Sequence, residues 1–289
     1  MLRAISSFVV VKHRLNVGWL DTFVRGGAQA VELFCAKAHF DYADRAQVKE
    51  ASSWFGDHKD IELRSLHSPL FADDWGRSGQ PPLNIAAKEK RERIDSMDEI
   101  KRALEVADAL PFRFLIQHIG LPNEAFDEAK FESAITSIEH LRAFAKPLGV
   151  TVLVENIPND LSTPARLMQL IESAHFDDVH VCFDAGHSHM RNFSGNADGG
   201  SRSIAADFAV LATRVRSTHI HDNCADRDAH LWPGTDTNGK GIDWNEFIPL
   251  LRNAPQRPPV LLEIEGEEGR EVKLAEDMTK TFSLFDNIN

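Results

Sequence analysis

Thiols are scarce in this chain of 289 residues. The three cysteines, Cys35, Cys182 and Cys224, are widely spaced and include no C-x-x-C pair. That scarcity excludes a disulfide framework and a zinc knuckle, and it indicates a reducing compartment such as the cytosol. Serine or cysteine nucleophile chemistry also lacks a signal, because no G-x-S-x-G motif occurs and Cys182 stands inside an apolar run, where it packs as a core residue.

Long apolar runs are missing as well. The apolar stretch near the N-terminus, Phe8 to Val11, is followed at once by Lys12, His13 and Arg14. It is too short for a signal peptide or a membrane span, so we expect neither secretion nor a membrane anchor. No linker rich in Pro, Gly or Ser divides the chain, and residues 1–289 are therefore expected to form a single domain.

Positive charge is in short supply. The chain has 32 Lys and Arg residues against 44 Asp and Glu residues, which gives a formal net charge of −12. This balance disfavours a protein that binds by laying a basic face along phosphates, although a local basic patch is compatible with an acidic total. Nucleic acid is therefore only the second-ranked partner.

A regular alternation runs through the chain. Eight short apolar runs, rich in β-branched residues, are each followed by a longer stretch with helical periodicity. This alternation is typical of βα units, and several runs are continuously apolar, as in parallel strands that are buried on both faces. The eight predicted strands cover residues 4–10, 30–34, 61–67, 112–118, 151–155, 179–184, 216–221 and 260–264.

Eight βα repeats in a chain of this length predict an α/β fold with a single (β/α)8 TIM barrel. An open dinucleotide-binding sheet is disfavoured, because no G-x-G-x-x-G turn follows the first run. Thr163, with Pro164 after it, and Asp243 precede apolar stripes and are predicted to cap helices. The irregular segments 71–84 and 223–241 follow strands and are expected to form loops over the active face.

Six consecutive runs, from the third to the eighth, carry a metal-binding residue type at or beside their end. A single histidine there is more often a structural residue, and a single carboxylate often caps the next helix. In a closed barrel, however, the carboxyl ends of the strands meet at one mouth, and burying six polar groups without a shared partner is costly. A divalent cation provides that partner. The six residues are His67, His118, Glu155, Asp184, His219 and Glu263.

Four of these residues, Glu155, Asp184, His219 and Glu263, combine three carboxylates with one imidazole. Such a set of oxygen and nitrogen ligands suits Mn²⁺, Mg²⁺, Co²⁺ or Zn²⁺ rather than a soft metal that prefers thiolates. Three carboxylates around one dication leave a net negative charge. That balance favours a metal with open or water-filled positions.

The motifs around these residues, in their order along the chain, resemble those of the xylose isomerase-like TIM barrel superfamily. That superfamily holds sugar isomerases and epimerases together with AP endonuclease family 2. A D-x-H motif followed by a Gly-rich loop after the seventh strand is part of the resemblance, which spans roughly residues 60 to 265. The motifs are Leu66-His67-Ser68-Pro69, Gln117-His118-Ile119-Gly120, Val154-Glu155-Asn156, Phe183-Asp184-Ala185-Gly186-His187, Thr218-His219-Ile220-His221-Asp222, Asp228-Ala229-His230 and Leu262-Glu263.

The isomerase and epimerase branch implies one metal ion, held here by Glu155, Asp184, His219 and Glu263. In that branch a ketose binds the metal through its carbonyl and adjacent hydroxyl oxygens. The resemblance implies that Glu155 and Glu263, on opposite faces of the substrate, are the catalytic base and acid. It leaves open which sugar is used, whether the sugar is phosphorylated, and whether the reaction is an isomerisation or an epimerisation.

The endonuclease branch implies three zinc ions and a phosphodiesterase that acts on DNA. Its ligands extend to positions that match five further residues of this chain. In sugar-acting members the same positions line the substrate site, so these residues are predicted to bind substrate or a second metal ion. They are His67, His118, His187, Asp228 and His230.

Other features favour the sugar-acting branch. The 223–241 loop carries three aspartates against Arg227 and Lys240, which is a poor surface for duplex DNA. The N-terminal Gly-rich motif of the endonuclease branch is absent, and the segment Gly241-Ile242-Asp243-Trp244 is similar to the sugar-acting group. A carbohydrate is therefore the expected partner, with a catalytically inactive carbohydrate-binding barrel as a further alternative. The sequence does not decide between a monomer and a homo-oligomer.

Two further sets of residues lie near the predicted site but are not predicted to bind the metal ion. His221 is expected to point to the side of its strand opposite His219, and His221 and Asp222 are expected to support the metal ligands from behind. The loop aromatics Phe71, Trp75 and Trp232 are candidates for stacking against a sugar face, with lid packing as the equal alternative.

Overall fold

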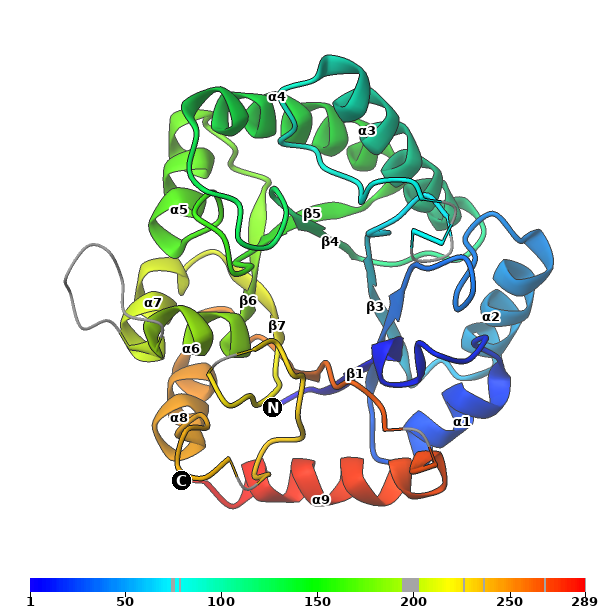
Figure 1. The fold of residues 1–289 in the computed structure, drawn as a ribbon. Helices are drawn as coiled ribbons and strands as arrows, with labels where there is room; N and C mark the ends of the chain where they lie inside the picture. The colour runs from blue at the N-terminus through cyan, green and yellow to red at the C-terminus, as the bar shows by residue number, and fades with distance from the viewer. Residues whose placement is uncertain are drawn as a thin grey trace.

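The chain folds into a ring of parallel strands surrounded by helices (Figure 1). The computed structural model describes residues 1–73, 76–77, 79–193, 203–225, 227–235, 237–267 and 269–288. Its eight strands are all parallel and pair in the order β7-β6-β5-β4-β3-β2-β1-β8, and a bridge between Ile220 and Leu262 brings β7 beside β8. The strands are β1 (Arg3–Ser6), β2 (Ala30–Phe34), β3 (Glu62–His67), β4 (Phe114–His118), β5 (Thr151–Glu155), β6 (His180–Asp184), β7 (Val215–His219) and β8 (Val260–Leu262).

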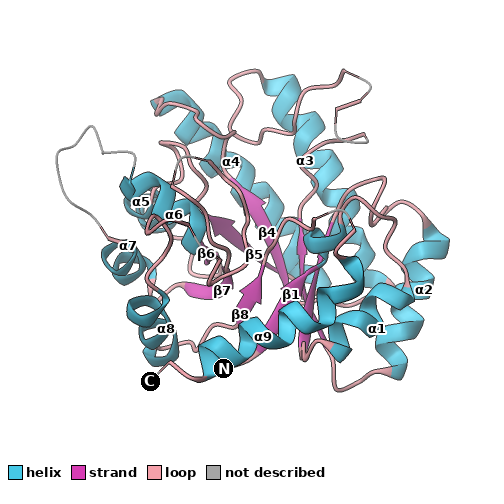
Figure 2. Ribbon diagram, turned by 60° about the horizontal axis from the view of Figure 1, so that its bottom comes forward, coloured by secondary structure: helices cyan, strands magenta, loops and turns pink. Residues whose placement is uncertain are grey.

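Helices cover the outside of the ring, as Figure 2 shows from a second direction. Thr163 accepts a hydrogen bond from the amide of Arg166, and Asp243 accepts one from Asn245, so both predicted helix caps are confirmed. The helices are α1 (Val17–Arg25), α2 (Arg45–Asp57), α3 (Lys90–Leu104), α4 (Glu128–Ala145), α5 (Pro164–Ser173), α6 (Ala185–Phe193), α7 (Ile204–Leu211), α8 (Trp244–Asn253) and α9 (Leu274–Asp286), with 3-10 turns η1 (Ser7–Val10), η2 (Glu105–Asp108), η3 (Lys146–Leu148) and η4 (Glu271–Lys273).

This architecture confirms the predicted (β/α)8 barrel and most of its strands, but the first strand was predicted too long. Its run of residues 4–10 ends as a strand at Ser6 and continues as η1. The Ser6 hydroxyl accepts a hydrogen bond from the amide of Phe8, and the Ser7 hydroxyl accepts one from the amide of Phe34. These side chains replace the strand ladder as partners of the backbone, so the chain turns across the mouth although its residues are apolar.

The core has two parts, one on each side of the strands. The larger part lies between the sheet and the helices and contains side chains such as Leu33, Leu66 and Val154. The smaller part fills the barrel interior with Phe114, Ile116, Leu153 and Cys182, and with a second group of Ala4, Ala30 and Leu261. Within the described residues, no helix combines the length and the apolar character that crossing a bilayer requires.

Candidate metal centre

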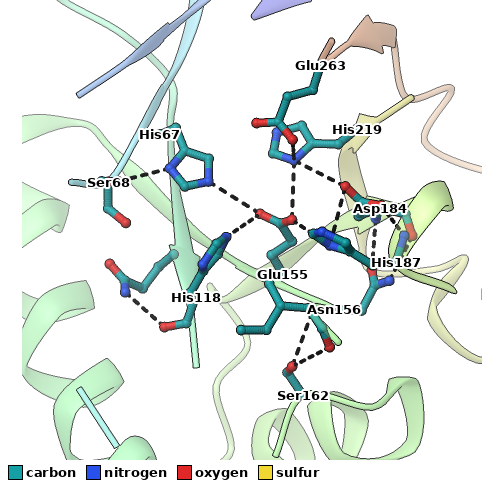
Figure 3. A network of polar contacts seen from close by, with 12 residues as sticks. His67, Ser68, His118, Glu155, Asn156, Ser162, Asp184, His187, His219 and Glu263 are labelled. Carbon is teal, nitrogen blue, oxygen red and sulfur yellow. Dashed lines mark hydrogen bonds and ion pairs between the residues drawn. The ribbon is translucent and has the colours of Figure 1, made fainter. Parts of the chain in front are cut away.

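The carboxyl ends of the strands bring the six predicted residues together at one mouth. His67, His118, Glu155, Asp184 and His219 are the last residues of β3 to β7, and Glu263 directly follows β8. Figure 3 shows their side chains turned toward a common centre, with Glu155 in the middle. All except the partly buried His118 are nearly or fully buried.

The four residues of the predicted metal set form one compact group. The Nδ1 atom of His219 lies 3.4 Å from Glu155 Oε1, 3.8 Å from Asp184 Oδ2 and 3.2 Å from Glu263 Oε2. One ligand atom from each of the four residues lies within 4.8 Å of the others. This spacing suits a shared cation, because ligands about 2 Å from a metal ion lie roughly 3 to 4 Å apart.

Glu155 also belongs to a second group, with His67 and His118. Its Oε2 atom lies 3.7 Å from His67 Nε2 and 3.3 Å from His118 Nε2. The carboxylate therefore stands between two adjoining sets of possible ligands, one toward β3 and β4 and one toward β6 to β8.

A third group lies on the other side of Asp184 and contains His187, His221, Asp228 and His230. His187 Nε2 is 3.0 Å from Asp228 Oδ2, and His230 Nε2 is 3.2 Å from Asp228 Oδ1. His187 Nδ1 also lies 3.3 Å from Glu155 Oε1, so this group adjoins the first. All nine residues singled out in the sequence thus lie in one connected cluster.

His221 belongs to this cluster, so the prediction that it points to the side of the strand opposite His219 is wrong. Its Nε2 atom lies 3.1 Å from Asp184 Oδ1, and its ring stacks on that of His230 with centroids 3.8 Å apart. The missed signal was its spacing, because residues two apart on a strand share a face and His221 follows His219 by two. Gly186 makes room for the ring, since a Cβ atom there would lie 2.0 Å from His221 Cε1.

Glu32 is a second residue that the sequence argument missed. It lies in the middle of β2, is fully buried, and has its carboxylate 3.2 Å from His219 Nε2. Glu32 lies inside its strand, whereas the predicted site residues lie at strand ends. An acidic residue inside the apolar run Ala-Val-Glu-Leu-Phe was the available signal.

Backbone and side-chain hydrogen bonds fix the segments that carry the cluster. The amide of Asn156 donates to the Asp184 carbonyl at 2.8 Å, and the Asp184 N–H donates back to Asn156 at 2.9 Å. Asp222 accepts hydrogen bonds from the Ile242 N–H at 3.0 Å and from Trp244 Nε1 at 3.1 Å. Asp222 therefore ties together the two ends of the 223–241 loop, which carries Asp228 and His230, as expected for a supporting residue.

Several buried polar atoms of the cluster have no hydrogen-bond partner among the described residues. They include both carboxylate oxygens of Glu155, His118 Nε2, His187 Nδ1 and His219 Nδ1. Leaving such atoms unpaired is costly in a folded interior. Their convergence on shared points fits a divalent cation, which would satisfy carboxylate and imidazole ligands together.

The pKa shifts of the clustered side chains also fit a divalent cation. Burial would raise the pKa of Glu155, but the neighbouring His219 and His118 hold that pKa well below its ordinary value. Burial would lower the pKa of His230, but Asp228 and Glu263 raise it to about 9. The carboxylates thus raise the pKa of His187 and His219 as well, whereas burial lowers that of His118, and a dication would compete with protons for the imidazoles whose pKa is raised.

A cavity of about 470 Å³ opens onto the cluster. Seven of the nine predicted residues line it, and Asp184 and His219 lie behind them. Apolar side chains, among them Phe8, Phe34 and Phe71, form much of the remaining wall, and its lining includes no Lys or Arg from the described residues. Trp232 lines a separate cavity, and Trp75 lies outside the described residues.

A ring of eight parallel strands surrounded by helices defines the class of (β/α)8 TIM barrels. The chain belongs to one family of this class, the xylose isomerase-like TIM barrel family, whose model matches residues 21–283.

Two curated relatives share part of the sequence. The uncharacterized protein MJ1614 of Methanocaldococcus jannaschii is 28% identical over 175 residues, which are 59% of this chain and 62% of the relative. The uncharacterized protein y4fM of Sinorhizobium fredii is 25% identical over 190 residues, which are 62% of this chain and 56% of the relative. The chain thus matches about 60% of the length of these relatives.

Solved structures share the fold over nearly the whole chain. A D-tagatose 3-epimerase-like protein has a TM-score of 0.75 at 21% identity, covering 99% of this chain and 98% of its own. D-psicose 3-epimerase, solved in the presence of D-fructose, has a TM-score of 0.73 at 15% identity, covering 100% and 99%. The IOLI protein, solved with a bound zinc atom, has a TM-score of 0.71 at 16% identity, covering 99% and 96%. These likenesses concern the fold.

Proposed function

We propose that this protein is a metal-dependent isomerase or epimerase that acts on a small sugar. One observation carries the proposal: Glu155 and Glu263 belong to the same possible metal group and line the same cavity. A carbon acid needs a base to remove its proton and an acid to return it, and two carboxylates at one substrate meet that need. The match of the family model to residues 21–283 supports treating residues 1–289 as one domain.

Glu155, Asp184, His219 and Glu263 would hold a divalent cation such as Mn²⁺, Mg²⁺, Co²⁺ or Zn²⁺. The bound cation would supply stabilisation of the negative charge that develops on substrate oxygens when the adjacent carbon loses its proton. Glu155 and Glu263 would exchange that proton on the two faces of the substrate. His187, Asp228 and His230 would orient substrate hydroxyls, because these residues line the cavity together with the two glutamates.

The wall of the cavity favours an unphosphorylated sugar. A phosphate group normally meets Arg, Lys or several backbone N–H groups, and no Lys or Arg of the described residues lines this cavity. The aromatic side chains suit the apolar face of a sugar ring or chain. Likeness in fold to D-tagatose 3-epimerase-like protein and D-psicose 3-epimerase supports a ketose as substrate.

Hydrogen exchange tests this proposal. The protein would be loaded with Mn²⁺ and incubated in D₂O with a panel of unphosphorylated ketoses, and incorporation of deuterium at carbon would be followed by NMR. Glu263→Gln should stop exchange, whereas Glu267→Gln, an exposed carboxylate in the following loop, should leave it unchanged. A loaded protein that binds sugar without any exchange would instead be a catalytically inactive carbohydrate-binding barrel.

A zinc-dependent phosphodiesterase of the AP endonuclease type is the second candidate. The observation that favours it is that possible ligands fall into four overlapping or adjoining groups, of which three include Glu155 and the fourth contacts it through His187. Several adjoining groups suit a site with more than one zinc ion, and clustered zinc ions can generate hydroxide and neutralise a phosphate. Three tightly held zinc ions per chain together with cleavage of an abasic-site duplex would replace the sugar proposal by this one.

A further inference from the structure

Glu32 is an acidic side chain in the interior of the barrel that the proposed mechanism does not use. It lies on β2 and is fully buried. The Ser65 hydroxyl, on the adjacent strand β3, donates a hydrogen bond to Glu32 Oε2 at 2.7 Å. The other partner is His219 on β7, which is not a neighbour of β2 in the sheet, so this contact crosses the barrel.

The contact uses one specific nitrogen of the His219 ring. Nε2 lies 3.2 Å from Glu32 Oε1 and 3.4 Å from Oε2, whereas Nδ1 faces Glu155, Asp184 and Glu263. A carboxylate accepts hydrogen bonds but donates none, so Nε2 must carry the proton in this pair. The lone pair of a neutral ring is then on Nδ1, where the other three possible ligands converge.

Packing alone does not account for a carboxylate at this position. A fully buried charge costs several kcal/mol unless it is paired and hydrogen-bonded, and an apolar residue of similar volume would fill the same space. The Glu32 partners are one hydroxyl and one imidazole, and that imidazole belongs to the metal group. Metal-bound histidines commonly donate their second N–H to a carboxylate, which fixes the tautomer and makes the ring a stronger ligand.

We propose that Glu32 is a positioning residue that holds His219 with Nδ1 free for the metal ion and strengthens the metal affinity of the whole group. This inference rests on the proposed metal centre but not on the identity of the substrate. Ser65 fixes the Glu32 carboxylate in turn. The series of side-chain contacts from Ser65 through Glu32 to His219 therefore connects three strands to the proposed cation site.

Metal titration of the full chain tests the role of Glu32. Mn²⁺ binding to the apo protein would be measured from the electron paramagnetic resonance signal of the free ion. Glu32→Gln keeps the shape and removes the charge, and we expect it to raise the Kd for Mn²⁺ by about 10- to 100-fold. The absorption bands of bound Co²⁺ should also shift, since they report the ligand geometry of the metal ion rather than the stability of the fold.

Two further variants separate positioning from general destabilisation. Glu99→Gln removes another buried carboxylate, one that binds Tyr42 on the outer side of the barrel, and it should leave the Kd unchanged. Ser65→Ala keeps the Glu32 charge but loosens it, and a rise in Kd smaller than that of Glu32→Gln is expected. Ser65→Ala also provides the test if Glu32→Gln does not fold.

The other outcomes of these titrations contradict either the positioning role of Glu32 or the metal centre itself. Wild-type affinity in both folded Glu32→Gln and Ser65→Ala, or an equal loss in Glu99→Gln, would overturn the positioning role and leave the metal centre intact. If the wild-type chain binds neither Mn²⁺ nor Co²⁺ at millimolar concentrations, the metal centre and this inference fail together. Failure to find a sugar substrate would affect only the proposed function.

Discussion

Two layers of side chains inside the same barrel differ sharply in character. The upper layer, at the carboxyl ends of the strands, is the cluster of possible ligands, whose buried oxygens and nitrogens contact one another as ion pairs. The lower layer comes two residues earlier on each strand, faces the same interior and is fully buried, but it is apolar or carries a small hydroxyl or thiol. Its members are Ser65, Ile116, Leu153, Cys182, Ser217 and Leu261.

Residues only two positions apart on the same strand therefore contribute to different properties: one packs the barrel interior and the next belongs to the candidate site. Side chains at positions i and i+2 share a face, so the lower layer supports the upper one from directly beneath. Lower-layer changes should therefore alter mainly the free energy of unfolding, and upper-layer changes should alter metal binding and turnover. Ser65 and Glu32 are the exceptions, because Glu32 contacts Ser65 in the lower layer and His219 in the upper one.

The largest effect is expected from the centre of the upper layer. Glu155→Gln removes a charge that belongs to or contacts every group of possible ligands, and we expect activity to fall roughly 10³-fold or more because both metal binding and proton transfer are lost. Turnover and metal content would be measured on the same sample. Full turnover by this variant would refute the shared metal site.

A change in the lower layer should lower the free energy of unfolding and leave metal affinity nearly unchanged. Leu153→Ala, two residues before Glu155, is expected to lower the free energy of unfolding by about 3 kcal/mol through lost burial and a residual cavity. The Kd for Mn²⁺ should stay within about a factor of three of wild type, because no ligand is removed. Urea unfolding and metal titration would measure the two effects. If the Kd of Leu153→Ala rises as much as that of Glu155→Gln, the two layers do not have separate roles.

Metal removal should act through the upper layer alone. At a free Mn²⁺ concentration of 100 times the Kd, the ion should raise the free energy of unfolding by ~2.7 kcal/mol relative to a sample in chelator. Thermal and urea unfolding with and without chelator would check this. Leu153→Ala should retain the increment, whereas Asp184→Asn should lose most of it.

A smaller and pH-dependent effect is expected outside both layers. Burial lowers the pKa of His39 to about 4, although its ring contacts the His13 carbonyl and the Ser7 hydroxyl. In the unfolded chain this pKa is about 6.5, so the unfolded state binds more protons between these values and stability falls as the pH drops through that window. From pH 7.5 to 5.0 the His39 contribution should fall by ~2 kcal/mol.

Urea unfolding of the chelated protein at the two pH values would measure this contribution. His39→Gln should lose that part of the acid sensitivity, while His140→Gln, an exposed residue of α4, should not. An identical pH dependence in wild type and His39→Gln would assign the acid sensitivity to other groups, with the ligand cluster as the first to examine.

The strands could be predicted wherever burial on both faces leaves a continuous apolar run. Residues 30–34 and 151–155 are strands with the predicted bounds. The strand predicted at residues 4–10 is too long because the residues of η1 are apolar too. The hydrogen bonds of the two serine hydroxyls that turn the chain there are not visible in the sequence pattern. The two-residue spacing from His219 could have placed His221 in the site, whereas nothing local indicated that Glu32 would meet His219 across the barrel.

The sequence by itself determined the barrel and the chemical types at its mouth, because hydrophobic periodicity and residue order are local properties of the chain. It also limited the charge at the mouth, where acidic residues outnumber basic ones. Only the tertiary structure decided which of these groups share a point in space, that Glu155 stands between two ligand sets, and that Glu32 supports His219 from a distant strand. Such contacts depend on closure of the ring, which brings together residues more than 180 positions apart.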